Sequence, residues 1–523
     1  MDIYFNGIIY LNDSSGARAE AMAVKDGRIA AVGHSKEILR MASRGDRIMD
    51  LEGDLILPGF VDTHMHFLEY AAEKSFADLS SSSSLEELLS ILKAGLDDAV
   101  RSGMPLRGTG FDHNTWASPV LPTRGDLDGI SREIPIIINR SCHHITVVNT
   151  PALKASGLED QCPDGILREN QQYILEETLP APSKDQIKAL VLDAARDAAS
   201  RGITQVQTDD LPVISSELYG RTILEAYAEL DREGQLPIRV YQQCNLPSME
   251  RLNAFLTAGY MTGQSTGHFT IGPLKLIGDG ALGARSAAMR DGYRDQPDNR
   301  GILNFTDDEL LELVSAAHHA GMQVAVHGIG DRCIEQILDT YEAVLREYPR
   351  PNHRHGIVHC QITRPDDIRR MADMGIMAYI QPVFLRADQH ITEERIGPEL
   401  TVTSYAWRAM ADLGIHLGGG SDCPVEPFDV LPNMYYAVTC REPGADRPWY
   451  PQKALTLDET IRAFTSEGAY ASFTEDRLGK LLPGFTADFT VVDRDVTVLP
   501  PESLCEAQTV MTFVDGKMIY EAR

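Results

Sequence analysis

Two histidines, His64 and His66, follow the apolar run 54–58 and could do chemistry together. A short apolar run bounded by turn residues predicts a buried strand. Residues two apart on a strand project to the same face, so both imidazoles should point the same way at its C-terminal end. Two imidazoles on one rigid strand can bind a divalent metal ion, although an isolated pair of this kind is about as often plain polar surface.

Further metal-binding or proton-transferring residue types lie at the ends of other apolar runs. They are Lys275 in the run 271–277, His327 closing 323–327, His359 closing 354–359 and Asp422 closing 415–422. Neutral imidazoles and a carboxylate suit Zn²⁺ or a similar divalent ion. We therefore expect a metal centre built from several strand ends. Arg285 and Gln381, at or near other strand ends, are candidates for contact with a substrate.

Strand-like runs alternate with amphipathic helices through the middle of the chain. Eight such runs occur, near 54–66, 202–207, 238–242, 271–277, 323–327, 354–359, 376–381 and 415–422. This alternation is typical of a parallel α/β fold and predicts a (β/α)₈ TIM barrel over residues 58–478. In that fold the catalytic residues lie at the C-terminal ends of the strands, where the candidate ligands fall.

The two ends of the chain differ from this middle part. Residues 1–57 and 479–523 contain short alternating segments with hairpin signals such as Asn6-Gly7 and Asp26-Gly27. We expect both ends to form one small β-sandwich. A long insertion, about 68–180, follows the first barrel strand and is rich in aromatic, His and Arg residues, which favours a structured lid over a linker.

Composition excludes several classes of partner. With 48 Lys and Arg against 76 Asp and Glu among 523 residues, the net charge is −28, which repels nucleic acid and anionic membrane surfaces. No apolar run is long enough to cross a membrane, and no signal peptide is visible. The 8 cysteines form no C-x-x-C pair and indicate reduced thiols. We therefore expect a cytoplasmic protein with a small-molecule substrate, and base rates favour a homodimer.

The candidate residues and their order resemble the amidohydrolase superfamily. The stretch 57–66 (LPGFVDTHMH) resembles its first-strand motif, Val326-His327-Gly328 and Val358-His359 resemble the fifth and sixth, and Gly420-Ser421-Asp422 resembles the eighth. Lys275 through Asp279-Gly280 looks like the fourth-strand motif of amidohydrolase family 3, the group that includes N-substituted formamide deformylase. The resemblance extends over essentially the whole chain.

The resemblance implies a metal-dependent hydrolase that cleaves a non-peptide C–N amide-type bond, with N-acyl or N-formyl amines as the nearest substrate class. One or two Zn²⁺ ions per chain would be held by His64, His66, Lys275, His327, His359 and Asp422. Lys275 would be an N6-carboxylysine, because a free ammonium cannot ligate a cation. Asp422 would exchange a proton between the metal-activated water and the leaving amine. The same likeness suggests that His144, Asp112 and Trp116 contact the substrate.

Other interpretations stay open at this point. Lys275 could pair with Asp279 beside a one-metal site. The same barrel supports other metal-dependent chemistry, such as that of a deaminase, cyclic amidase, esterase, decarboxylase or isomerase. A metal-free binding or regulatory protein on a decayed hydrolase scaffold is a third possibility, although every expected ligand type is present.

Overall fold

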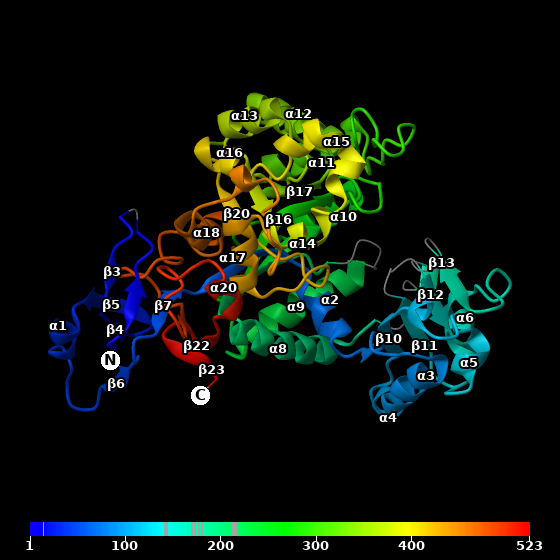
Figure 1. Ribbon diagram of the computed structural model, residues 1–523, viewed down its shortest axis with the longest axis horizontal. Coiled ribbons are helices and arrows are strands. Elements are labelled where there is room, and N and C mark those ends of the chain that lie inside the picture. The colour runs from blue at the N-terminus through cyan, green and yellow to red at the C-terminus, as the bar shows by residue number, and fades with distance from the viewer. Residues whose placement is uncertain are drawn as a thin grey trace. The chain divides into compact units, whose positions relative to one another are not determined.

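The computed structural model divides the chain into two compact units. It describes residues 1–13, 15–140, 145–168, 171, 174–175, 178, 181–211 and 217–522. The first unit comprises residues 1–67, 192–213 and 227–523, and the second comprises 68–191 and 214–226. Each unit has its own sheets, shown with their labels in Figure 1.

Eight strands of the first unit form one sheet in which every pair of neighbours is parallel. They are β8 (Phe60–Met65), β14 (Ile203–Thr208), β15 (Arg239–Asn245), β16 (Phe269–Ile277), β17 (Val324–Gly328), β18 (Gly356–His359), β19 (Met377–Ile380) and β20 (Leu417–Gly419). These strands coincide with the eight apolar runs of the sequence. The predicted (β/α)₈ TIM barrel is thus confirmed.

The first and last strands of this sheet meet at their carboxyl ends. Asp422, just after β20, donates its backbone N–H to the carbonyl oxygen of His64 at 2.8 Å, and His66 donates to the carbonyl of Cys423 at 2.7 Å. Strands β8 and β20 approach each other closely here because Gly418 has no side chain. A Cβ at this position would lie 2.9 Å from Cγ2 of Thr63. These contacts join the ends of the sheet into a ring.

Amphipathic helices follow the strands and cover the outside of the barrel. They include α10 (Met249–Thr257), α11 (Asp307–His319), α12 (Asp331–Glu347), α13 (Pro365–Met374), α15 (Thr392–Thr403), α16 (Trp407–Asp412), α17 (Val430–Thr439), α18 (Leu457–Ala463) and α19 (Ser466–Ala471). A capping box of Thr306 and Glu309 starts α11, and Gly375 ends α13 at a φ of +69°. Figure 1 shows α11, α12 and α13 grouped outside β17.

Both chain ends contribute to a mixed sheet beside the barrel strands. Its order is β23 (Lys517–Glu521), β22 (Thr509–Val514), β21 (Phe489–Val492), β7 (Leu55–Pro58), β2 (Ile8–Tyr10) and β3 (Arg18–Ala19). A second sheet contains β5 (Arg28–Gly33), β4 (Ala21–Lys25), β1 (Asp2–Phe5) and β6 (Arg47–Asp50). Tyr4 packs against Phe489 at 5.2 Å between ring centroids, in a core shared by both ends. The predicted terminal sheets are thus confirmed.

The second unit folds around its own sheet. The strand order is β13 (Ile166–Arg168), β12 (Ile145–Val148), β11 (Ile136–Arg140), β10 (Leu106–Phe111) and β9 (Ala77–Asp78). Its helices include α3 (Leu85–Ala94), α4 (Leu96–Ser102), α5 (Arg124–Asp128) and α6 (Thr150–Ser156). Leu88, Leu92, Phe111 and Ile138 are buried together in its core. The insertion therefore has enough apolar packing of its own to be structured, and its role as a lid stays a prediction.

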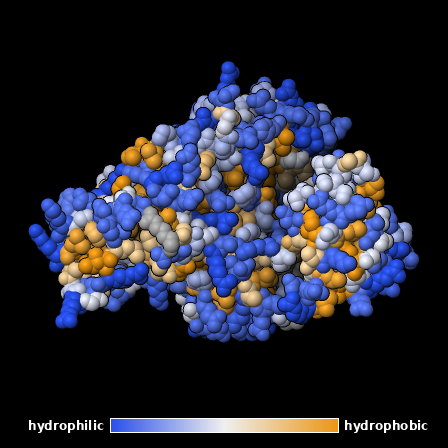
Figure 2. All heavy atoms as spheres, turned by 60° about the horizontal axis from the view of Figure 1, so that its bottom comes forward, coloured by the Kyte–Doolittle hydropathy of each residue, from blue (hydrophilic) through white to orange (hydrophobic). Residues whose placement is uncertain are grey.

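Polar residues dominate the face of the molecule drawn in Figure 2, as the charge of −28 leads one to expect. Within the described part of the chain, no helix combines the length and the apolar character needed to cross a bilayer.

Candidate metal centre

Three of the predicted ligands converge at the carboxyl end of the barrel. Nε2 of His64 lies 3.2 Å from Oδ1 of Asp422, and Nε2 of His66 lies 3.3 Å from the same oxygen. One ligand atom from each residue falls within 4.8 Å of the other two. His64 and Asp422 are buried, whereas His66 is partly exposed. This arrangement can hold one metal ion.

Contacts on the far side of each ring fix which imidazole nitrogen carries the proton. Nδ1 of His64 lies 2.8 Å from Oε1 of Gln243, and Nδ1 of His66 lies 3.0 Å from the backbone oxygen of Asp209. Because amide oxygens only accept hydrogen bonds, both Nδ1 atoms must donate. The lone pair of each Nε2 is therefore directed to the side of Asp422.

The donor set calls for a cation. Two Nε2 lone pairs face an oxygen of Asp422, and among the described residues no donor hydrogen-bonds to that buried oxygen. Such a meeting of electron pairs is unfavourable in a buried site unless a positive charge lies between them. Burial lowers the pKa of His64 to about 4, so this ring is neutral at physiological pH. Neutral imidazoles with a carboxylate fit Zn²⁺.

His327 and His359 extend the cluster. The ring centroids of His64 and His359 are 5.5 Å apart, and those of His359 and His327 are 4.5 Å apart. Nδ1 of His359 lies 2.8 Å from Oε1 of Gln381, and the ring stacks on Phe384. Burial lowers the pKa of His359 well below its usual value. All four predicted histidine ligands thus lie in one continuous group.

Lys275 lies in the same region but does not contact Asp279. Its Nζ is 3.9 Å from Oδ2 of Asp209, and both side chains are buried. Oδ1 of Asp279 lies 3.0 Å from Nδ1 of His327. Burial lowers the pKa of Lys275, against the opposing attraction of Asp209 and Asp422. The ion pair with Asp279 that the sequence left open is therefore replaced by an approach to Asp209.

The two other candidates in the first unit have protein partners. Arg285 donates from Nε and Nη2 to Oδ2 of Asp295 at 2.9 and 2.5 Å. Gln381 uses its oxygen to accept from His359, as described above. Contact between either residue and a substrate stays a prediction.

Asp112 and Trp116 lie in the second unit. Asp112 accepts a hydrogen bond from Nη2 of Arg140 at 2.6 Å. The indole N–H of Trp116 donates to the carbonyl of Ser82 at 2.8 Å, and the ring is buried in that unit's core. His144 lies outside the described residues. Their contact with a substrate likewise stays a prediction.

Three further polar residues shape the centre that sequence patterns did not single out. Gln243 and Asp209 support the first two histidines, and Asp62 accepts from the backbone N–H groups of His64 and Ser421, both at 3.1 Å. Asp209 directly follows the buried strand β14, and Gln243 lies within β15. The available signal was a polar residue in or directly after an otherwise buried strand.

Comparisons with known proteins assign the chain to a family. A model described as "Amidohydrolase family" matches residues 47–520. YtcJ of Bacillus subtilis (strain 168) is 29% identical over 99% of both chains. N-substituted formamide deformylase of Arthrobacter pascens is 26% identical over 97% of this chain and 96% of its own. The crystal structure of an uncharacterized metal-dependent hydrolase from Pyrococcus furiosus has a TM-score of 0.81 and 28% identity, covering 94% of this chain and 99% of its own. The chain belongs to the amidohydrolase family.

Proposed function

We propose that this protein hydrolyses a non-peptide C–N amide-type bond and that its substrates are N-acyl or N-formyl amines. The observation that carries the proposal is the convergence of His64, His66 and Asp422 on one point at the carboxyl end of the barrel. The name of the relative from Arthrobacter pascens, N-substituted formamide deformylase, supports this substrate class.

We further propose zinc as the metal, held by His64, His66 and Asp422, with His327 and His359 completing the ligand set. Bound there, a divalent ion would act as a Lewis acid that polarises the substrate carbonyl and makes water a stronger nucleophile at neutral pH. Burial lowers the pKa of His64 and of His359, so these two imidazoles remain unprotonated and can act as neutral nitrogen donors.

Asp422 is the proposed general acid/base. Its Oδ1 lies 3.2 Å from Nε2 of His64 and 3.3 Å from Nε2 of His66, and its backbone N–H donates to the carbonyl of His64, which fixes the main chain at this residue. The Asp422 carboxylate takes a proton from the attacking water and delivers it to the nitrogen of the leaving amine. Delivery of that proton matters because an unprotonated amine anion is a very poor leaving group.

Lys275 is proposed to be carboxylated. Its neutral amine nitrogen forms a bond to the carbon of CO₂ and releases one proton, which gives an anionic side chain able to bridge two metal ions. Without this modification, Lys275 has Asp209 as its counter-charge 3.9 Å away, and the site would hold one ion.

Metal content and intact mass test these proposals together. The protein is purified without added metal, and zinc per chain is measured by elemental analysis beside intact mass spectrometry under non-acidic conditions. Near two zinc ions with a mass increase matching CO₂ would support the bridged centre, and one zinc with unmodified lysine would support the single-ion form. Amine release from a panel of N-formyl and N-acetyl amines tests the reaction. Failure to bind any metal, or metal binding without amine release, would contradict the proposed function.

A further inference from the structure

Two glutamines, one within β15 and one directly after β19, each contact a predicted histidine ligand. Neither of these two strands carries a predicted ligand itself. Gln243 lies on β15 and contacts Nδ1 of His64 at 2.8 Å, and Gln381 directly follows β19 and makes the same contact with His359. Gln243 is fully buried. A buried amide is costly unless both of its ends are hydrogen-bonded, so its partners reveal what the position requires.

Both ends of the Gln243 amide are engaged, and this fixes its orientation. Nε2 donates to the backbone oxygen of Thr63 at 3.0 Å, which requires the nitrogen to face β8 at that residue. The side-chain oxygen is then left to accept from Nδ1 of His64. Gln243 thereby contacts two consecutive residues of the ligand-bearing strand, across the intervening strand β14.

We infer that Gln243 is a positioning residue for the metal centre. It holds His64 in the Nδ1–H tautomer and fixes the ring plane, so that Nε2 is available as a donor. The inference rests on the metal centre of the proposed function. It assigns the role to a neutral amide, which supports the imidazole without adding a negative charge to the site.

A buried glutamine on the neighbouring strand provides a matched control. Gln207 of β14 is also fully buried, and its Nε2 donates to the backbone oxygen of Gly468 at 2.8 Å. Within the described residues, the side chain of Gln207 donates to that carbonyl and does not hydrogen-bond to a predicted ligand. Replacing either glutamine by leucine removes one buried amide from the barrel, but only one of the two changes should disturb His64.

The test measures zinc retained by the full-length protein against a graded series of a chelator. We expect Gln243→Leu to weaken zinc binding by about 10- to 100-fold, and Gln207→Leu to leave it within about twofold of wild type. Gln243→Glu should retain more zinc than Gln243→Leu but less than wild type, because a carboxylate oxygen still accepts from Nδ1 of His64 while its other oxygen cannot donate to the carbonyl of Thr63. Circular dichroism of each variant reports whether it is folded.

If Gln243→Leu does not fold, Gln243→Asn replaces it, since its shorter side chain keeps the amide but withdraws the oxygen from His64. Wild-type retention by Gln243→Leu or Gln243→Asn would overturn the inference and leave the proposed function standing. Equal losses in Gln243→Leu and Gln207→Leu would also overturn it, because any buried amide would then suffice. A wild-type protein that binds no zinc would overturn the metal centre itself and the inference with it.

Discussion

The backbone N–H of Asp422 donates a 2.8 Å hydrogen bond to the carbonyl oxygen of His64. Two candidate ligands from opposite ends of the barrel sequence are therefore connected through the main chain, beside the 3.2 Å approach of their side chains. The distance between them is set by how the first and last strands meet. The geometry of the candidate ligands therefore depends on how the barrel closes.

Gly420→Ala should disturb the metal centre without altering a ligand. A Cβ at this position would lie 2.8 Å from the backbone nitrogen of His64 and 2.9 Å from Oδ1 of Asp62. Because the contacted atoms belong to the backbone and to a buried carboxylate, relief requires β8 to move. We expect a cost of about 1–3 kcal/mol in stability together with reduced zinc retention. Thermal unfolding and elemental analysis measure the two effects.

Gly283→Ala is the control for that substitution. The nearest atom to a Cβ at Gly283 is Cδ1 of Ile391 at 3.8 Å, which is ordinary contact. This variant should unfold at the wild-type temperature and retain zinc. A Gly420→Ala protein that matched it in both respects would show that the two strand ends can separate without consequence.

Asp422→Asn should abolish most turnover while keeping the fold. The amide preserves the size of the side chain, and the backbone bond to His64 is unaffected. Loss of the proton-transferring carboxylate should lower kcat by about 10²- to 10⁴-fold. Steady-state kinetics of amine release, with zinc content measured on the same samples, check this outcome. Near-normal kcat with zinc bound would show that another group transfers the proton.

Stability should fall on mild acidification because of His353, a buried histidine that is not a candidate ligand. His353 accepts from the backbone N–H of His355 at 2.8 Å through Nδ1, while its Nε2 lies 3.0 Å from the oxygen of Met374. Protonating Nδ1 of His353 would place its N–H against the backbone N–H of His355, which is unfavourable. Burial, aided by the nearby charge of Arg350, lowers the pKa of His353 to about 4 from its usual 6.5.

The sign of this effect follows from proton binding. The unfolded chain takes up a proton near pH 6.5, while the folded chain resists until about pH 4, so the stabilisation is complete above 6.5 and is lost progressively between these values. The full contribution is about 3 kcal/mol. Denaturant unfolding from pH 8 to 5 should show a shallower loss in His353→Gln than in wild type, and equal slopes would contradict this assignment.

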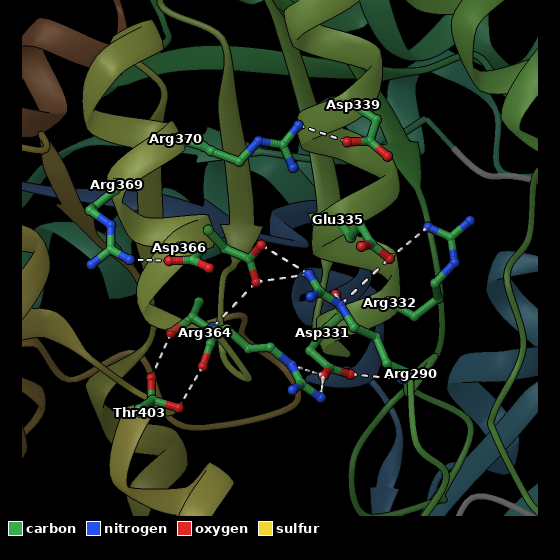
Figure 3. A network of polar contacts seen from close by, with 12 residues as sticks. Arg290, Asp331, Arg332, Glu335, Asp339, Arg364, Asp366, Arg369, Arg370 and Thr403 are labelled. Carbon is green, nitrogen blue, oxygen red and sulfur yellow. Dashed lines mark hydrogen bonds and ion pairs between the residues drawn. The ribbon is translucent and has the colours of Figure 1, made fainter.

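Asp331→Ala should destabilise the barrel more than any exposed ion pair nearby. Asp331 is fully buried at the start of α12, where it accepts from the backbone N–H of Arg290 at 3.0 Å and from Nε of Arg364 at 2.7 Å (Figure 3). Its loss leaves Arg364 without its buried partner, at a cost of about 3 kcal/mol. Asp366→Ala breaks a pair with Arg369 on the exposed surface of α13 and should cost less than about 0.5 kcal/mol. Denaturant unfolding of both variants makes the comparison, and equal costs would contradict it.

The barrel and the positions of the main candidate ligands were predictable because their signals are local. Each strand is a buried apolar run, and parallel strands in a barrel bring their carboxyl ends together, so His64, His327 and Asp422 had to approach one another. Their order along the chain added a family resemblance. The fold and the place of the candidate site thus followed from short segments.

The supporting contacts were not predictable for the same reason. Gln243 meets His64 across β14, and no spacing in the sequence reveals which buried glutamine faces which ring. Lys275 approaches Asp209 on a different strand, whereas Asp279, four residues away in the sequence, turns to His327. Such choices depend on register between strands, which residue types alone do not specify.

The sheet shared by the two chain ends has a consequence for biosynthesis. Leu57 of β7, seven residues before His64, pairs with Thr490 of β21, several hundred residues later in the chain. During translation the strand that leads directly into β8 has no β21 neighbour until several hundred further residues have been synthesised. Until β21 has been synthesised, the apolar strand β7 lacks this neighbour, and an unpaired apolar strand edge is prone to aggregation. Completion of the sheet that leads into β8 is therefore a late event in the synthesis of each chain.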